Sequence, residues 1–287
     1  MKGFRLGVRL RQATVGPAAP RFAIAVCALL ASACADRATA ADWPLRGSVA
    51  PSYARWDGWQ VGVQAGFGNM NTDFGTSTSS QIAFILRNST LENEASPSDW
   101  TTLPATSTNG PVFGGFIGYN VQWSELVVGF DLAYNHPSIF QTSVGDSINR
   151  IVTTSDGVTN DVTISAQSMI KLVDYATLRA RAGYAFSQFL PYAVIGFAAG
   201  RFNQATGVTV TVIQTPPVGP PTQFGPVTAG SSKDNAIVGG VAAGLGIDWA
   251  VTPNVFLRAE WEYITFAPVN DIRTNINTGQ VGVGLRF

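Results

Sequence analysis

Apolar residues alternate with small or polar residues along most of the chain after residue 58. In the first such segment Trp59, Val61, Val63, Ala65 and Phe67 share one parity, and glycine or glutamine occupies the other. Because side chains of a strand point to alternate faces, this period of two predicts a β-strand with one apolar face. We predict eight strands, at residues 59–67, 113–121, 128–134, 178–184, 190–200, 241–249, 257–263 and 281–287.

The second face of these strands is dominated by glycine, with charged and amide side chains at the remaining positions. The polar face of a soluble sandwich meets water and is usually rich in Lys, Glu, Ser and Thr. Glycine inside a strand is unfavourable unless space is short, as it is within a narrow barrel. Outward aromatic residues near the strand ends suit the girdles of a membrane barrel, namely Trp59, Tyr119, Tyr134, Tyr184, Trp249 and Tyr263.

Short and long connections alternate between the predicted strands. Tight turns fall at residues 123–125, 187–188 and 252–254. The other connections are long and polar at residues 69–110, 135–167 and 201–234, with a shorter one near residues 265–275. This order predicts an all-β fold, an eight-stranded antiparallel transmembrane β-barrel with short periplasmic turns and long extracellular loops. The proline-rich run 215–221 in the third long connection cannot pair into a sheet.

The first forty residues have the order of a secretory signal. Basic residues come first, an apolar run follows at residues 22–33, and Ala38-Thr39-Ala40 precedes Ala41. We predict a signal peptide at residues 1–40 cleaved between Ala40 and Ala41, a periplasmic lead at residues 41–55 and a barrel at residues 56–287. An alternative interpretation is a lipoprotein that is acylated at Cys34.

Charge and cysteine content exclude several classes of function. Residues 1–40 hold 6 of the 18 basic and 1 of the 18 acidic residues, so 12 basic and 17 acidic residues remain and the formal charge becomes −5. A chain with this charge and no basic block is not expected to bind nucleic acid. Both cysteines, Cys27 and Cys34, leave with the signal, and His136 is the only histidine. We therefore predict no metal site and no cofactor.

Four segments resemble motifs of one known family. Residues 56–68 resemble its W-x-G-aromatic opening strand, residues 114–122 its G-G-x-x-G-Y-N-x-Q strand, residues 177–184 its T-x-R-x-R-x-G-Y motif, and residues 259–263 its E-Y-x-Y motif, with Trp261 replacing an aromatic. Together they resemble the alphaproteobacterial small outer-membrane β-barrel proteins, OmpA-type and porin-like barrels that include major surface antigens and haemin-binding members. The resemblance implies a Gram-negative outer membrane.

The last residues of the chain are similar to the signal that the outer-membrane assembly machinery reads. That segment alternates Val283, Leu285 and the terminal Phe287 with smaller or polar residues. The resemblance therefore implies the assembly machinery as a partner, together with outer-membrane lipids and lipopolysaccharide.

Charged residues on the second face are the strongest candidate site. We predict that they form a lumen charge network of paired side chains, namely Asp131, Arg179, Arg181, Asp248, Arg258, Glu260, Glu262 and Arg286. Such pairs would plug a narrow, low-dielectric lumen. The alternatives are a water or ion path gated by these pairs, and catalysis by Glu260 and Glu262, for which no nucleophile or metal site is evident.

His136 is placed in the loop just past the third predicted strand, close to Ser138. Some small outer-membrane barrels are lipid-modifying enzymes with a His-Ser pair at the outer rim, and haem ligation by His136 would need a second axial ligand. We predict instead a structural protein without enzyme activity that supports envelope integrity and displays surface loops. A narrow porin-like channel and a surface protein binding haemin or a host surface are the alternatives.

Overall fold

The computed structural model describes residues 54–287 with the exception of residues 102 and 270. The predicted signal peptide at 1–40, its cleavage between Ala40 and Ala41, and the predicted lead up to residue 53 lie outside the described residues. No helix in the described part of the chain is long and apolar enough to cross a membrane.

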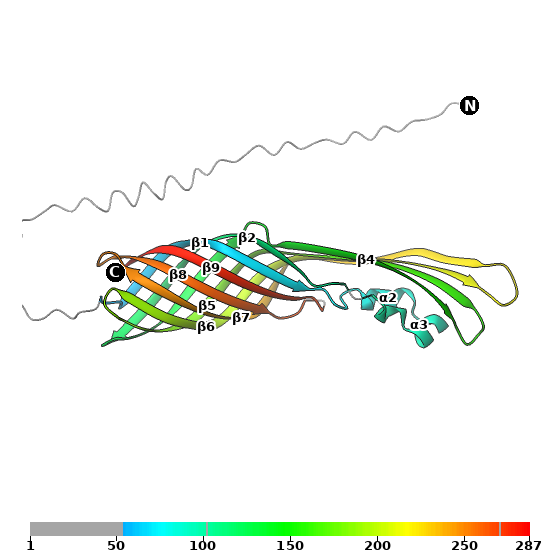
Figure 1. Ribbon diagram of the computed structural model, residues 1–287, viewed down its shortest axis with the longest axis horizontal. Helices are drawn as coiled ribbons and strands as arrows, with labels where there is room; N and C mark the ends of the chain where they lie inside the picture. Colours follow the sequence, from blue (N-terminus) through cyan, green and yellow to red (C-terminus); the bar gives the residue numbers. More distant parts are fainter. Residues whose placement is uncertain (1–53, 102, 270) are drawn as a thin grey trace, which may run out of the picture. The chain divides into compact units, whose positions relative to one another are not determined.

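Eight antiparallel strands close into a barrel, as the alternation predicts (Figure 1). The strands of the chain are β1 (Gly58–Asp73), β2 (Thr106–Trp123), β3 (Leu126–Pro137), β4 (Gln141–Thr153), β5 (Thr159–Tyr184), β6 (Phe189–Thr215), β7 (Thr222–Ala250), β8 (Val255–Phe266) and β9 (Arg273–Arg286). Pairing of β3 with β5 closes the ring, so β4 is a ninth strand outside it. The three predicted tight turns connect β2 to β3, β5 to β6 and β7 to β8.

The lumen-facing glycines make room for large side chains from neighbouring strands. A Cβ atom on Gly62 would lie 2.4 Å from the Phe116 ring, and one on Gly118 would lie 2.3 Å from a carboxylate oxygen of Asp131. Both distances are shorter than any van der Waals contact. Glycine on this face is therefore a consequence of the filled lumen, as the sequence pattern indicates.

The opposite face of the barrel is apolar and exposed, as the inside-out pattern of a membrane barrel requires. Leu245 on β7 is 59% exposed, and exposed large apolar residues on the neighbouring strands include Ile195, Phe197 and Trp261. The predicted girdle residues Trp59, Tyr134, Tyr184 and Trp249 are among the exposed aromatic side chains of this face.

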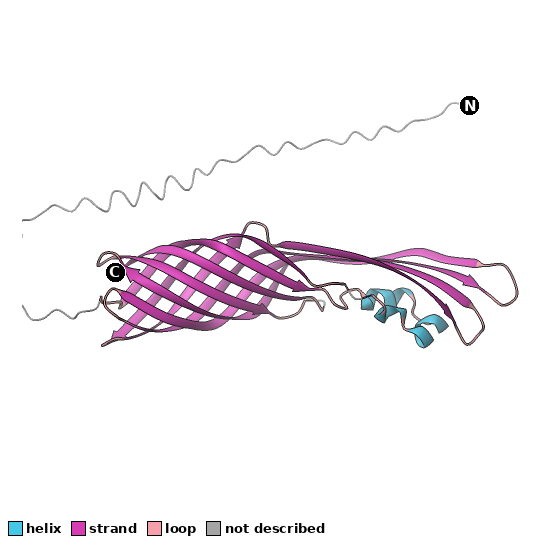
Figure 2. Ribbon diagram, viewed as in Figure 1, coloured by secondary structure: helices cyan, strands magenta, loops and turns pink. Residues whose placement is uncertain are grey.

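Two of the predicted long loops are mostly strand, which corrects the expectation for residues 135–167 and 201–234. β5, β6 and β7 continue past the barrel and pair with β4 to form a four-stranded sheet, the extension sheet (Figure 2). It comprises β4 and the parts of β5, β6 and β7 at residues 159–172, 202–215 and 222–236. The Thr- and Ser-rich composition concealed a second alternation, in which buried Val and Ile residues share one face of β5 and β6.

Irregular pairing marks the junction of the barrel and the extension sheet. The register shifts between Leu172 and Asp174 on β5, and between Phe202 and Gln204 on β6. Such bulges bend a strand and increase its twist. They lie where the curved wall of the barrel continues into the open sheet. Residues 216–221 of the proline-rich run form the connection between β6 and β7, outside the pairing, as predicted, whereas its first residue, Thr215, ends β6 and pairs with Thr159.

A helical segment between β1 and β2 covers one face of the extension sheet. It contains α2 (Ser79–Ile85), α3 (Thr90–Ala95) and the 3-10 turn η2 (Pro97–Asp99). Ile82, Leu86 and Leu91 are buried in the same apolar cluster as Val162 and Val210 of the sheet. The hydroxyl of Ser89 accepts a hydrogen bond of 3.1 Å from the Glu92 N–H and so caps α3. The first long loop is thus a packed cover and not an open loop.

The outward assignment predicts the effect of a charge on the barrel wall. Leu245→Arg should destabilise the folded barrel in lipid by about 2–4 kcal/mol, because it places a cation on the lipid-facing surface. Ser232→Arg, on the exposed part of β7 in the extension sheet, is the matched control and should have little effect. Unfolding by urea in lipid vesicles measures both. Equal stability of the two variants would contradict the lipid-facing assignment.

Candidate functional site

Seven charged side chains from four strands meet inside the barrel and form what we call the lumen charge cluster. β3 contributes Asp131, β5 contributes Arg179 and Arg181, β7 contributes Asp248, and β8 contributes Arg258, Glu260 and Glu262. Strand register explains part of this arrangement, since Asp131 lies directly opposite Arg179 and Asp248 directly opposite Arg258. Inward parity, predicted from the sequence, brings the remaining members into the same space.

Arg179 is the centre of one half of the cluster. One terminal nitrogen lies 2.5 Å from Glu260 Oε1 and 2.8 Å from Glu262 Oε1, and the other lies 3.6 Å from Asp131 Oδ2. The Arg179 side chain is 0% exposed and each of these carboxylates is at most 2% exposed. Several partners offset more of the desolvation cost of a buried ion than a single partner does.

Asp248 is the centre of the other half. Its Oδ1 accepts a hydrogen bond of 3.0 Å from Arg258 Nε, and its Oδ2 accepts one from Arg181. Arg258 also lies 3.3 Å from Asp131 Oδ2, which links the two halves. Asp131 is therefore within ion-pair distance of all three arginines, although only Arg179 faces it directly on a neighbouring strand.

Neutral side chains that were not predicted as site residues complete the cluster. Gln60 Nε2 donates a hydrogen bond of 2.7 Å to Asp131, and the Tyr192 hydroxyl donates one of 2.8 Å to Glu260. The Arg181 guanidinium lies 3.5 Å from the centre of the Tyr192 ring, and that of Arg258 lies 3.9 Å from the Phe116 ring. Inward parity was the available signal for Gln60 and Phe116, whereas Tyr192 lies in the least regular predicted strand.

Apolar layers lie on both sides of the charge cluster along the barrel. The periplasmic layer contains Trp56, Phe116, Leu190 and Phe256, with the Trp56 and Phe256 rings 6.0 Å apart. The outer layer lies toward the extension sheet and includes Met70, Phe74, Phe140, Phe202, Ile264, Phe266 and Ile276.

Strand β8 contributes side chains to the charge cluster and to both apolar layers. The inward residues of β8 are, in order, Phe256, Arg258, Glu260, Glu262, Ile264 and Phe266, and each is at most 6% exposed. Paired charges are thus enclosed between apolar side chains, in a space that the strands keep narrow.

Arg286 was predicted to belong to the lumen charge network, but it lies outside the clustered residues. Its Nε donates a hydrogen bond of 2.7 Å to the Pro253 carbonyl oxygen, and its guanidinium lies 4.5 Å from the centre of the Trp56 ring. Arg286 is the last residue of β9, so its inward side chain reaches the periplasmic layer and not the middle of the barrel.

His136 lies within β3 and not in the loop beyond it, which corrects the expected position. Its side chain is exposed, and its strand partner is the outward-facing Phe113. The other predicted catalytic candidates, Glu260 and Glu262, are both held by Arg179. Among residues 54–287, apart from 102 and 270, no three His, Cys, Asp or Glu side chains are grouped so that they could hold a metal ion.

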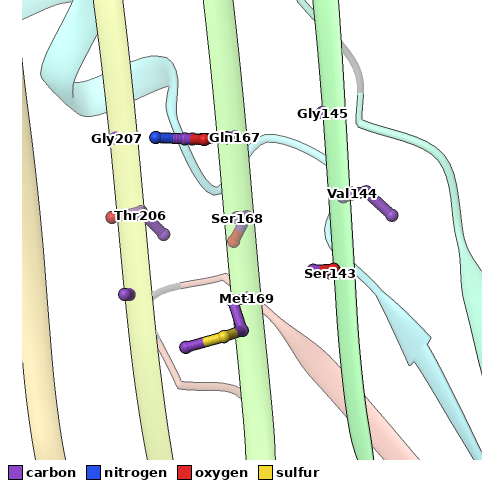
Figure 3. A pocket seen from close by; sticks show the side chains of 9 residues that line it. Ser143, Val144, Gly145, Gln167, Ser168, Met169, Thr206 and Gly207 are labelled. Atoms are coloured by element: carbon purple, nitrogen blue, oxygen red, sulfur yellow. The ribbon is translucent and has the colours of Figure 1, made fainter. Parts of the chain in front are cut away.

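A shallow hollow lies on the extension sheet, outside the barrel that holds the charge cluster. It has a volume of about 500 Å³, and its lining comes from β4, β5 and β6. Figure 3 shows the Gln167 side chain on β5 reaching toward Gly207 on β6, with Gly145 on the neighbouring β4. Because both flanking residues lack side chains, Gln167 stands over an indented part of the sheet.

Comparison with known proteins identifies the fold family. The model of the outer membrane protein beta-barrel domain family matches residues 25–287. The chain belongs to this family. The barrel is therefore an outer-membrane barrel of the Gram-negative cell envelope, and the family part of the predicted resemblance is confirmed. The alphaproteobacterial subfamily stays a prediction. No curated protein matches the chain.

Solved structures of small outer-membrane proteins are similar to this outer-membrane barrel. The attachment invasion locus protein Ail of Yersinia pestis is 13% identical, with 81% of this chain and 100% of that chain covered and a TM-score of 0.34. OprG of Pseudomonas aeruginosa is 11% identical, with 80% of this chain and 96% of that chain covered and a TM-score of 0.37. The Neisserial surface protein A is 14% identical, with 80% of this chain and 97% of that chain covered and a TM-score of 0.32.

Asp248 is the common ion-pair partner of Arg181 and Arg258, so its removal should have a large effect on the stability of the barrel. Asp248→Ala should destabilise the barrel by about 3–5 kcal/mol, because Arg181 and Arg258 lose their common partner in a buried site. Arg55→Ala is a matched control, since the Arg55–Asp57 pair is exposed and such pairs contribute about 0–1 kcal/mol. Urea unfolding measures both changes. A loss below about 1 kcal/mol for Asp248→Ala would show that water reaches the cluster.

Proposed function

We propose that this outer-membrane barrel is closed to solutes and serves the envelope as a structural protein that displays the extension sheet. The observation that carries the proposal is the order of layers in the lumen, with paired charges enclosed between two apolar layers. A porin has a polar, water-filled interior. An ion crossing this lumen would have to displace apolar side chains at two levels and separate buried ion pairs between them.

The narrow-channel alternative requires a polar path past the charge cluster. Gln64, Gln280 and Thr278 do place polar side chains on the lumen side between the cluster and the outer layer, but each is at most 6% exposed. Such a path would therefore need side chains to move. We propose that the lumen of the resting barrel does not conduct.

Binding and catalysis are less well supported than a structural role. Glu260 and Glu262 are engaged with Arg179, and His136 faces outward from the wall. A catalytic group needs access to a substrate, whereas these two carboxylates are enclosed. We propose that the barrel is not an enzyme. Binding of haemin or of a host surface would have to use the extension sheet or the rim.

We also propose that outer-membrane lipids and lipopolysaccharide surround the barrel and that the assembly machinery reads its end. The lipids would contact the exposed apolar wall. Leu285 and Phe287 are exposed on the outer side of the last strand, and Val283 shares their parity. Side chains that point outward in alternation offer a row that another protein can bind.

Conductance tests the closed lumen. The chain refolded in detergent and inserted into a planar bilayer should give no single-channel currents, because the apolar layers exclude hydrated ions. A sixteen-stranded porin in the same bilayer is the positive control, and a heat-dependent mobility shift establishes that the tested sample is folded. Regular unitary currents from the folded chain would overturn the closed-lumen proposal and favour the channel.

An in vivo measurement tests the structural role itself. A strain lacking the chain should leak periplasmic enzymes and regain a tight envelope when the chain is restored. Unchanged leakage together with slower uptake of small solutes would contradict the structural role.

The assembly signal can be separated from folding. Phe287→Ser should lower the amount of barrel in the outer membrane of cells, because the row of outward side chains loses its terminal member. The same variant should refold in detergent like the wild type, since Phe287 is bonded to Trp59 through backbone atoms. Immunoblots of outer-membrane fractions and mobility shifts measure the two effects. Equal outer-membrane levels would remove Phe287 from the signal.

A further inference from the structure

Within the part of the chain that the structure describes, the extension sheet has two edges without a strand partner, and the two edges differ in character. On one side β7 is the last strand, and its outer part contains Pro226, which has no N–H, and Gly225 in the left-handed region at φ +86°. Exposed Lys233 and Asp234 follow, and the pairing of β7 with β6 is irregular. Proline, charge and irregular pairing are features by which proteins prevent an edge from pairing with another chain.

The β4 edge lacks most of these protections. β4 pairs with β5 over its entire length of 13 residues, without a bulge, and contains no proline. The Ser147 N–H donates a hydrogen bond to the neighbouring Asp146 carboxylate. The carbonyl oxygen of Phe140, just before β4, accepts one from the Leu172 N–H of β5, so the even-numbered parity is directed to β5. Because edge-directed groups alternate along a strand, the odd-numbered residues of β4 direct their N–H and C=O groups to the free edge.

The sequence of β4 is complementary to itself when two copies run antiparallel. A two-fold axis through Ile148 places Ile148 opposite Ile148 of the second copy. It places Asp146 of each copy opposite Arg150 of the other, so the register contains two such charge pairs. It also places Val144 opposite Val152. These even-numbered residues would form the non-hydrogen-bonded pairs, in which facing side chains approach most closely. Moving the axis to Ser147 would place Asp146 opposite Ile148 and would lose both charge pairs.

The same register explains an exposed apolar residue and the hollow of Figure 3. Ile151 is 68% exposed on the uncovered face of the sheet. With the axis through Ile148, Ile151 of one copy lies opposite Gly145 of the other, and Gly145 lines the hollow. The hollow is also lined by Met169 and Ala205, so an apolar side chain can cover it.

Strand direction determines where the second copy stands. Near the barrel Gln141 pairs with Lys171, and at the far end Thr153 pairs with Thr159, so β4 runs away from the barrel. An antiparallel partner therefore has its own barrel at the opposite end of the shared sheet. Copies in one membrane all point the same way and cannot pair antiparallel along strands that rise from it. At roughly 3.3 Å per residue the shared segment is about 40 Å long.

We propose that the free edge of β4 binds the β4 edge of a second copy in an opposing outer membrane and so joins two membranes. The partner is another copy of this chain, recognised by backbone pairing, by the two Asp146–Arg150 pairs and by Ile151 against Gly145. This inference rests on the extension sheet and does not require the lumen to be closed. Its failure is therefore distinguishable from a failure of the conductance test.

Charge exchange between Asp146 and Arg150 tests the proposal. The full chain is reconstituted into phosphatidylcholine vesicles carrying either a donor or an acceptor dye, and energy transfer reports vesicle clustering. Wild-type vesicles should cluster. Asp146→Arg alone and Arg150→Asp alone should each reduce clustering to the level of protein-free vesicles, because like charges then face each other. A mixture of the two single variants should cluster again, as should the double variant alone.

Matched controls on the β7 edge separate edge pairing from general charge effects. Asp234→Arg and Lys233→Asp change the same charges and should leave clustering unchanged. A heat-dependent mobility shift establishes that every variant has a folded barrel. Absence of clustering in the wild type, clustering of each single variant at the wild-type level, or failure of the mixture to cluster would overturn the proposal.

Cross-linking tests the register independently. In the full chain with Cys27→Ser and Cys34→Ser, Ile148→Cys should form a disulfide-linked dimer on oxidation of clustered vesicles, because the axis passes through this position. Ile151→Cys should not, since it faces Gly145 of the partner. Equal cross-linking at both positions would overturn the proposed register.

Discussion

An eight-stranded ring encloses a space that side chains alone can fill, and the rest of the barrel depends on that narrowness. Glycine is needed wherever an aromatic ring or a carboxylate projects from a neighbouring strand, as Gly62 shows beside Phe116 and Gly118 beside Asp131. The charged residues then have no access to bulk water, so each must find its partners within the lumen. The same restriction accounts for the glycine-rich face, the charge cluster and its enclosure by apolar layers.

Five of the seven ions in the cluster have more than one oppositely charged partner. Asp248 accepts from Arg181 and Arg258, and Arg179 contacts Glu260 and Glu262. A buried pair is weak evidence for stability, because desolvation opposes the attraction between its members. What the arrangement does provide is specificity, since a shift in strand register would turn these side chains toward lipid. The charges thereby help to select one alignment of β3, β5, β7 and β8.

Period-two alternation was sufficient to predict the barrel strands, their tight turns and the inward direction of Asp131 and the arginines. It was insufficient for contacts that depend on three dimensions. Arg286 points inward like the clustered residues, but it lies at the end of β9. Its position along the barrel, and not the direction of its side chain, separates it from the other charges. Tyr192 lies in the strand with the weakest alternation, and no local signal indicates that its hydroxyl meets Glu260.

The extension sheet was not predicted, because its period-two alternation sets apolar residues on one face against hydroxyl and amide side chains on the other. One face carries Val and Ile, and the other carries hydroxyl and amide side chains, such as Ser147 next to Ser165 and Thr209 next to Thr228. Threonine and serine suggested a solvated loop when the whole segment was averaged. Whether α2 and α3 would cover the apolar face depended on contacts between distant segments, which periodicity does not report.

The uninterrupted course of β5, β6 and β7 has a mechanical consequence. Each strand passes from the barrel into the extension sheet as one element, with irregular pairing at the junction but no break in the chain. A force that pulls on the outer end of this sheet acts along the strands, so it loads the hydrogen bonds between neighbouring strands in shear. Strands loaded in shear must break many hydrogen bonds together, whereas peeling breaks them one at a time. Tension at the cell surface is thus carried directly into the membrane wall by the polypeptide backbone.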